Sequence, residues 1–367
     1  MEFSAPKHPS RTWLPALALP AAWILLFYLL RANRPVMAFW VTRIMAPVEQ
    51  FLGRLWAVFP VSVGELMVAL LIAALVVWLL RAVVLLVLHR RGRDFLKRLL
   101  VPLSAVLWVW CLLCWMWNAS YSAPTFTEQS GLSSQGHTPE ELVCTTIWFA
   151  QNAAELSTQI PRDVDGHFAV STETCLQSGV TIYDHLTEEF PFLDIPSTPV
   201  KPLLFSRLQS ILGFTGVYLP FSGEANVNVD APACLLPVTI AHEMSHQRMV
   251  ASEAEANFVG VAACLSCDDV VFRYSGYLQG LISLSNALNK VAPELWQEIM
   301  TATFTPELVT DWNDNYYYWK SLESPLEETA EQTYDSFLKG NGQSLGVASY
   351  GAYVDLLITY YLPKILT

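Results

Sequence analysis

The chain has 367 residues, of which 53% are hydrophobic and only 15% are charged, and its mean hydropathy is positive. This composition excludes a single ordinary soluble domain. Residues 1–117 hold 12 Lys and Arg against 4 Asp and Glu, a net charge of +8, whereas residues 118–367 hold 9 against 29, a net charge of −20. The acidic second part argues against a nucleic acid as a partner.

The first third of the chain contains three long apolar segments, residues 13–30, 61–88 and 99–117. A helix of about 20 apolar residues crosses the ~30 Å hydrocarbon core of a bilayer. The third segment ends in a group of tryptophans that is typical of a membrane interface, namely Trp108, Trp110, Trp115 and Trp117. We therefore predict a membrane anchor over residues 1–117 with three transmembrane helices, and the lipid bilayer as a partner.

Basic residues near these segments predict the orientation. Lys7 and Arg11 precede the first segment, and five more basic residues lie between the second and third, at Arg90, Arg91, Arg93, Lys97 and Arg98. Basic loops stay on the cytoplasmic side. We therefore expect a multi-pass protein of the cytoplasmic membrane, with its N-terminus inside and everything after the third segment outside.

The second part of the chain has the length and patterning of one domain. Residues 118–138 read as a linker, and residues 139–367 as the domain. Helical patterns cover residues 139–159, 172–190, 201–212, 237–249, 252–265, 274–291, 324–339 and 349–362. Residues 216–230 are the best strand candidate, with a hairpin-like break at Ser222 and Gly223. Cys264 and Cys267 have a metal-site spacing but lie on an apolar helix face, which favours buried free thiols.

The most informative motif is His-Glu-Met-Ser-His at residues 242–246. His242 and His246 are four residues apart, so on a helix they share a face and can bind one zinc ion. Glu243 lies about 100° around that helix and can act as general base on a water that the metal activates. The apolar residues 235–241 precede the motif and predict a buried helix, where an unpaired imidazole is costly.

A zinc hydrolase usually has three protein ligands and keeps its fourth position open. Glu253 is the favoured third ligand, with Asn257 four residues later on the same face as a group that orients a ligand. The segment resembles the Glu-x-x-Ala-Asp element of gluzincin-type peptidases, with Asn257 in place of Asp. Glu255 is the alternative ligand, although it points about 200° away on that helix.

Two further groups are candidates for substrate chemistry. The strand segment Glu224, Ala225, Asn226, Val227 and Asn228 directly precedes the motif and could hold a peptide by backbone hydrogen bonds, with Glu224 as a second acidic contact. The alternative is a plain core hairpin. Tyr350 is the first candidate for stabilising the oxyanion formed on a peptide carbonyl.

These segments together resemble an uncharacterised bacterial membrane family, the domain of unknown function 3810. The resemblance rests on Lys201-Pro202, residues 218–228, Ala241-His-Glu-Met-Ser-His-Gln247 and Glu255-Ala-Asn-Phe258, and extends to Leu338-Lys-Gly-Asn341 and Ser349-Tyr350. It implies a membrane-anchored protein similar to zinc metallopeptidases. In that family a Gly often stands where this chain has Met249.

We therefore predict a mainly α protein: three transmembrane helices, then an α+β, mostly helical, zincin-like domain with a small hairpin or sheet beside the motif helix. The expected function is zinc-dependent hydrolysis of peptide bonds in a peptide or protein substrate outside the cytoplasm. One alternative is a non-catalytic, zinc-stabilised module for binding or assembly in the envelope. A site-2-type intramembrane protease is disfavoured, because only seven apolar residues precede His242 where a span needs about 20.

Overall fold

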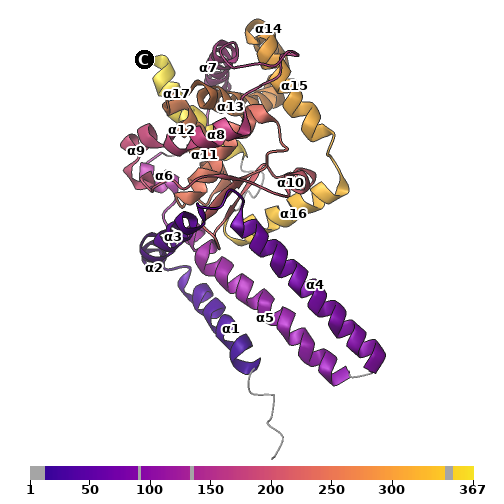
Figure 1. The fold of residues 1–367 in the computed structure, drawn as a ribbon. Helices are drawn as coiled ribbons and strands as arrows, with labels where there is room; N and C mark the ends of the chain where they lie inside the picture. The colour runs from indigo at the N-terminus through magenta and orange to yellow at the C-terminus, as the bar shows by residue number, and fades with distance from the viewer. Residues whose placement is uncertain (1–12, 90–91, 133–135, 344–349) are drawn as a thin grey trace, which may run out of the picture. The chain divides into compact units, whose positions relative to one another are not determined.

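The computed structural model describes residues 13–89, 92–132, 136–343 and 350–367. Figure 1 shows a mainly helical chain with a small sheet. The chain divides into two compact units. The first unit comprises Met1–Met45 and Gly64–Ala123, and the second comprises Ala46–Val63 and Pro124–Thr367. The short segment Ala46–Val63, which the sequence assigns to the membrane anchor, therefore folds with the C-terminal domain.

The first unit is built from three long helices, α1 (Trp13–Leu30), α4 (Val63–His89) and α5 (Gly92–Met116), and the short helix α2 (Arg34–Trp40). A π-helical segment (Val41–Met45) and a 3-10 segment (Asn118–Ser122) complete it. Helix α1 packs along α5, and the Trp115 indole donates to the backbone oxygen of Trp23 at 3.1 Å. The Trp78 indole donates to the backbone oxygen of Arg98 at 3.0 Å and so joins α4 to α5.

Within the described residues, two helical stretches are long and apolar enough to cross a membrane, Val63–Leu88 and Arg98–Asn118. The prediction of three such helices is wrong in this respect. The apolar stretch of α1 is Pro15–Leu30, which at about 1.5 Å per residue is only ~24 Å long, and Pro20 interrupts it. That length is short of the ~30 Å hydrocarbon core.

The second unit confirms the prediction of a mostly helical domain. Its helices are α3 (Ala46–Trp56), α6 (Phe126–Ser130), α7 (Pro139–Ser157), α8 (Thr172–Ser178), α9 (Asp184–Glu189), α10 (Ser206–Ile211), α11 (Leu236–Gln247), α12 (Glu253–Ser266), α13 (Val270–Val291), α14 (Pro293–Thr303), α15 (Pro306–Lys320), α16 (Pro325–Gly340) and α17 (Tyr350–Leu366). The core lies among α7, α11, α12, α13 and α17. Large side chains fill it, including Phe149, Phe258, Phe272 and Leu281, all at most 1% exposed.

The sheet has three short strands, β1 (Lys201–Pro202), β2 (Gly216–Leu219) and β3 (Glu224–Val227), in the order β1-β3-β2. The predicted hairpin is confirmed: β2 pairs antiparallel with β3, and Gly223 makes the turn at a φ of 66°. Strand β1 pairs parallel with β3. Helix α11 packs against β2 and β3, so the sheet lies beside the motif helix.

Several predicted helix boundaries are wrong. The helix expected over residues 201–212 begins only at Ser206, because Lys201 and Pro202 pair with β3 instead. The helix expected over residues 172–190 is split by a 3-10 turn at Gly179–Thr181. Helices α14 and α15 are absent from the sequence prediction. Each begins with a Pro in its first turn, a recognisable start signal.

Candidate metal centre

Helix α11 presents the two histidines of the motif. Pro237 lies in its first turn, where the missing N–H of proline costs no helical hydrogen bond. Ile240, Ala241 and Met244 are fully or almost fully buried, so packing holds the helix in place. The imidazole rings of His242 and His246 lie 4.9 Å apart, centroid to centroid, at an angle of 88°. The sequence prediction of two histidines on one buried helical face is therefore confirmed.

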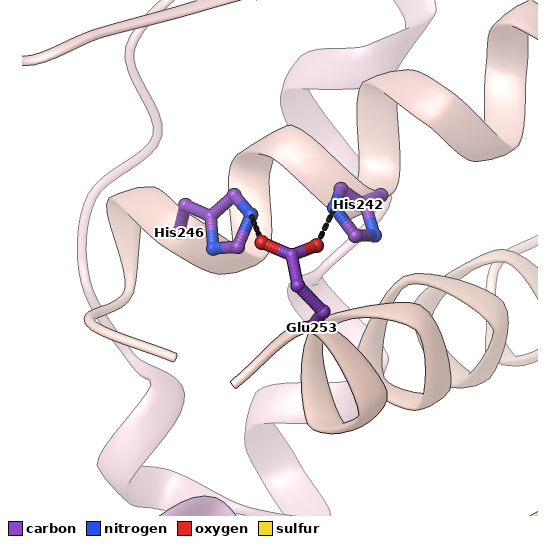
Figure 2. Close-up of side chains that lie close together, drawn as sticks. All are labelled: His242, His246 and Glu253. Atoms are coloured by element: carbon purple, nitrogen blue, oxygen red, sulfur yellow. Dashed lines mark ion pairs between the residues drawn. The ribbon is translucent and has the colours of Figure 1, made fainter. Parts of the chain in front are cut away.

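The carboxylate of Glu253 lies between these rings, as Figure 2 shows. Its Oε2 is 3.4 Å from Nε2 of His242, and its Oε1 is 3.8 Å from Nε2 of His246. One ligand atom from each residue falls within 4.8 Å of the others. Two ligands at ~2.05 Å from a tetrahedral zinc ion stand about 3.4 Å apart. The two distances from Glu253 to the histidines are close to this value, so the three side chains form a compact candidate group for a metal ion.

The turn between α11 and α12 brings Glu253 back to the histidines. Met249 adopts a φ of 64°, a left-handed conformation that costs a residue with a side chain about 1–2 kcal/mol. This explains why glycine suits the position better. The turn also places the backbone oxygen of Val250 2.7 Å from Nδ1 of His246. That contact makes Nδ1 the protonated nitrogen and leaves the lone pair on Nε2, toward Glu253.

Close packing of α12 on α11 sets the distance from Glu253 to His242. Gly260 lies seven residues after Glu253, two turns along the same face of α12. A Cβ added at Gly260 would come within 2.9 Å of the His242 backbone nitrogen and 3.0 Å of its Cα. Only glycine lets the two helices approach this closely.

The structure separates the two candidate third ligands. Glu255 faces away from the histidines, and its carboxylate accepts hydrogen bonds from the backbone N–H groups of Phe126 and Thr127 and from the Thr127 hydroxyl, at 2.7–3.1 Å. It therefore caps the N-terminus of α6. Glu253 is the carboxylate that meets the histidines. Burial opposes protonation of His242, but Glu253 and, to a smaller extent, Asn257 favour it and raise its pKa. Nδ1 of His242 is nevertheless buried without a hydrogen-bond partner among the described residues, so no hydrogen bond from Asn257 orients it.

Glu243 is a buried carboxyl group beside this cluster. It is 3% exposed, and its Oε2 has no hydrogen-bond partner. Its carboxyl group lies against Gly216 at the start of β2, where a Cβ would approach the Glu243 Cδ to 2.8 Å. Burial raises the pKa of Glu243 to about 8. A buried acid with an open oxygen is suited to exchanging a proton near neutral pH.

The electrostatics of the cluster keep Glu253 ionised beside the two histidines. Burial lowers the pKa of His246 to about 4. Burial opposes ionisation of Glu253 as well, but the two histidines and the Tyr334 hydroxyl outweigh it and lower the pKa of Glu253 to about 2. Burial likewise opposes protonation of His242, yet the neighbouring carboxylates outweigh it and raise that pKa. Glu253 is thus an anion that stays charged although its side chain is half-buried.

Tyr334 is a site residue that the sequence prediction missed. It lies on α16, and its hydroxyl donates to Oε1 of Glu253 at 2.5 Å. Its ring packs edge-on against Phe214 at 5.7 Å. No signal in the sequence points to this residue, because 81 positions separate it from Glu253 and only tertiary packing brings α16 to the cluster.

The predicted substrate-binding strand is wrong. Glu224, Ala225, Asn226 and Val227 form β3, which is the central strand and pairs on both sides. β1 covers it at Asn226 and Val227, and all four residues are at most 1% exposed, so the strand cannot take a peptide. Glu224 is 1% exposed and forms an ion pair of 2.6 Å with Lys201. Asn228 is equally buried, and its amide donates to the Ser210 hydroxyl and the backbone oxygen of Phe214. The core-hairpin alternative describes this segment correctly.

Two other predictions concern residues outside the cluster. Tyr350 is the first residue of α17, but its side chain lies outside the described residues, so its predicted role remains a prediction. Cys264 and Cys267 are buried free thiols, as expected. The other cysteines are free as well, and the described structure contains no disulfide among them.

Comparison with known proteins places the chain in a family. A family model described as "Protein of unknown function (DUF3810)" matches residues 40–358. No curated protein and no solved structure matches the chain. The match spans α3, both candidate membrane helices, the sheet and the whole His242–His246–Glu253 cluster. It confirms the family resemblance of the sequence motifs, and the chain therefore belongs to the DUF3810 family.

Proposed function

We propose that the protein is a membrane-anchored, zinc-dependent hydrolase of peptide bonds. The observation that carries this proposal is the convergence of His242, His246 and Glu253 within 4.8 Å in a largely buried place. Two imidazoles and one carboxylate are one of the donor sets that catalytic zinc sites use. The unpartnered, buried oxygen of Glu243 beside it supports a catalytic rather than a purely structural site.

In this proposal His242, His246 and Glu253 hold the ion, and Val250 and Tyr334 orient two of these ligands. Zinc would supply Lewis-acid activation of water and of the scissile carbonyl. Glu243 accepts the proton of the attacking water and delivers it to the leaving amine. Its burial keeps competing water away from that proton.

Strand β2 is the element that would hold the substrate. It is an edge strand, since β3 is its partner in the sheet order. Its first residue, Gly216, lies against the Glu243 carboxyl group. A peptide that added to this edge as a further strand would pass directly beside the proposed general base.

We further propose that the domain faces away from the cytoplasm. The second unit contains both the segment before α4 and the chain after α5. Both ends of the α4–α5 pair therefore belong on one side of the membrane. The basic cluster of residues 90–98 lies between the two helices and in the first turns of α5, which favours the cytoplasmic side for this end of the pair.

The test uses the full chain purified in detergent. We expect about one zinc ion per chain by elemental mass spectrometry, and hydrolysis of peptides in a fluorogenic library. Glu243→Gln should keep the zinc and lower turnover by about 10²–10⁴-fold, the contribution of a general base.

Glu255→Gln is the matched control, because Glu255 lies in the same segment but caps α6. It should keep both zinc and turnover. Full turnover by Glu243→Gln would refute the assigned role. Stoichiometric zinc without turnover on any peptide would favour a zinc-stabilised binding module, and an absence of bound metal would overturn the proposal.

A further inference from the structure

A helix that packs on a domain usually buries its apolar residues and exposes its charged ones. Helix α3 shows the reverse distribution. Its buried side carries Glu49, which is 1% exposed and accepts a hydrogen bond from the Tyr218 hydroxyl at 2.7 Å. Its outward side carries large apolar residues: Phe51 is 66% exposed, and Val48 and Leu55 are also exposed. An acidic residue faces the protein while apolar residues face outward. Water is a poor solvent for such a face.

The inward side of α3 is fixed firmly to the domain. Gly53 and Gly223 pack backbone to backbone: a Cβ at Gly53 would come within 2.6 Å of the Gly223 oxygen. The buried Lys201 ammonium donates to the backbone oxygens of Trp56 and Val61 at 2.6 and 3.2 Å. Helix α3 therefore cannot turn over to bury its apolar residues without breaking these contacts.

The apolar face continues beyond α3. Val58 is 78% exposed, and Phe59 next to it is exposed as well. Lys201 ties this turn to the strand that leads into α10, where three more large apolar residues are exposed, Leu204, Phe205 and Leu208. We call the eight residues Val48, Phe51, Leu55, Val58, Phe59, Leu204, Phe205 and Leu208 the apolar face. Soluble surfaces rarely expose so many large apolar residues together.

We propose that the apolar face inserts into the interfacial region of the lipid bilayer. Chain continuity favours the bilayer: α3 ends at Trp56, seven residues before Val63, where a helical stretch long and apolar enough to cross a membrane begins. An amphipathic helix that lies in a membrane interface has this form.

The distribution of charge also supports contact between the apolar face and lipid. The domain from residue 118 onward carries 29 acidic residues, which an anionic lipid surface would repel. Segment 46–63, by contrast, contains only one acidic residue, the buried Glu49, and its one basic residue, Arg54, is exposed. Arg54 can reach lipid phosphates while its neighbours Phe51 and Leu55 insert.

A consequence concerns the substrate, and it rests on the proposed function. Helix α3 packs directly against α11, and Tyr218, which binds Glu49, has its ring 6.4 Å from that of His246. The candidate metal centre is therefore one layer of structure from the apolar face. Substrates would be peptide segments that lie close to the membrane surface.

The test measures lipid contact in the full chain, reconstituted into nanodiscs whose lipids carry bromine on the acyl chains. An environment-sensitive fluorescent amino acid replaces Phe51, Val58 or Phe205, one at a time. These side chains are exposed, so the replacements leave the core intact. Matched controls carry the label at Val164 or Tyr317, which are 100% and 63% exposed.

We expect brominated lipid to quench the label at least about twofold more at residues 51, 58 and 205 than at 164 and 317. Equal quenching at all five positions, or none at 51 and 58, would overturn the proposal. As a second measurement, a photo-crosslinking amino acid at residue 51 should form lipid adducts. Cross-linking to a second copy of the chain instead would show that another protomer covers the face. Glu243→Gln should give the same quenching, so the result does not depend on catalysis.

Discussion

Substitution of Gly260 by Ala tests whether the spacing of α11 and α12 assembles the cluster. The added Cβ would lie 2.9 Å from the His242 nitrogen and 3.0 Å from its Cα, whereas ordinary contacts begin at 3.4 Å. Both contacts are to backbone atoms, which cannot rotate away. The helices must therefore separate by about 0.5 Å, which exceeds the tolerance of ~0.2 Å in metal–ligand distances.

The expected result is a loss of metal affinity that exceeds the loss of stability. Overpacking of this kind costs about 1–3 kcal/mol, and replacing a helical glycine by alanine returns about 0.5–1 kcal/mol. The variant should therefore fold. Misplaced supporting groups typically lower metal affinity by about 10–100-fold, and we expect a loss in that range.

The assay is a competition titration of zinc against a chromophoric chelator, with thermal unfolding in the same detergent. Gly276→Ala is the matched control for overpacking. Its Cβ would meet Cys264 and Leu265 at 2.6 Å, near the far end of α12 and ~16 Å from Glu253. It should lower stability and keep zinc affinity. Gly340→Ala, on α16, meets no described atom within 4 Å and should change neither. Zinc affinity of Gly260→Ala within twofold of the wild type would refute the reasoning.

Three further predictions concern single interactions. Glu253→Gln should abolish stoichiometric zinc binding, whereas Glu255→Gln should keep it and loosen α6. Zinc content tests the first effect, and amide hydrogen exchange of residues 126–130 tests the second. Equal zinc content in the two variants would contradict the assignment of Glu253 as the ligand. Tyr334→Phe removes the hydrogen bond to Glu253 and should weaken zinc binding by about 10-fold without changing the melting temperature by more than a few degrees, and unchanged affinity would show that Glu253 needs no such support. Lys201→Met leaves the buried Glu224 carboxylate without its ion pair and should destabilise the protein by about 3–5 kcal/mol. The double variant Lys201→Met, Glu224→Gln should recover part of this loss. If Lys201→Met alone were as stable as the wild type in thermal unfolding, Glu224 would have to be uncharged.

The local sequence predicted the motif helix and the hairpin correctly because both depend on short-range rules. His242 and His246 share a face by helical periodicity alone, and Gly223 allows the positive φ that the turn requires. The preference for Glu253 over Glu255 also followed from periodicity, since residues 253 and 257 lie on one face of α12. The structure agrees, because Glu255 is engaged at the start of α6.

The errors have a common physical origin. The prediction of a substrate-binding strand rested on the place of residues 224–228 directly before the motif, but β1 covers the other side of β3 through the pairing of Lys201 with Asn226. The same pairing removed Lys201 from the helix predicted for residues 201–212. Contacts between distant segments decided these cases, and local patterns do not contain them.

By itself, the amino-acid sequence determined the helical content, the apolar N-terminal segments and the family, and it favoured the three side chains of the candidate metal centre, because composition and helical spacing act over a few residues. Only the tertiary structure decided that Tyr334 supports Glu253, that β2 and not β3 forms the edge beside Glu243, and that Ala46–Val63 belongs to the C-terminal domain. These features depend on close packing between segments far apart in the chain, at Gly260, Gly216 and Gly53. At each position a side chain would collide with a segment distant in sequence, so the need for glycine can be recognised only in the folded structure.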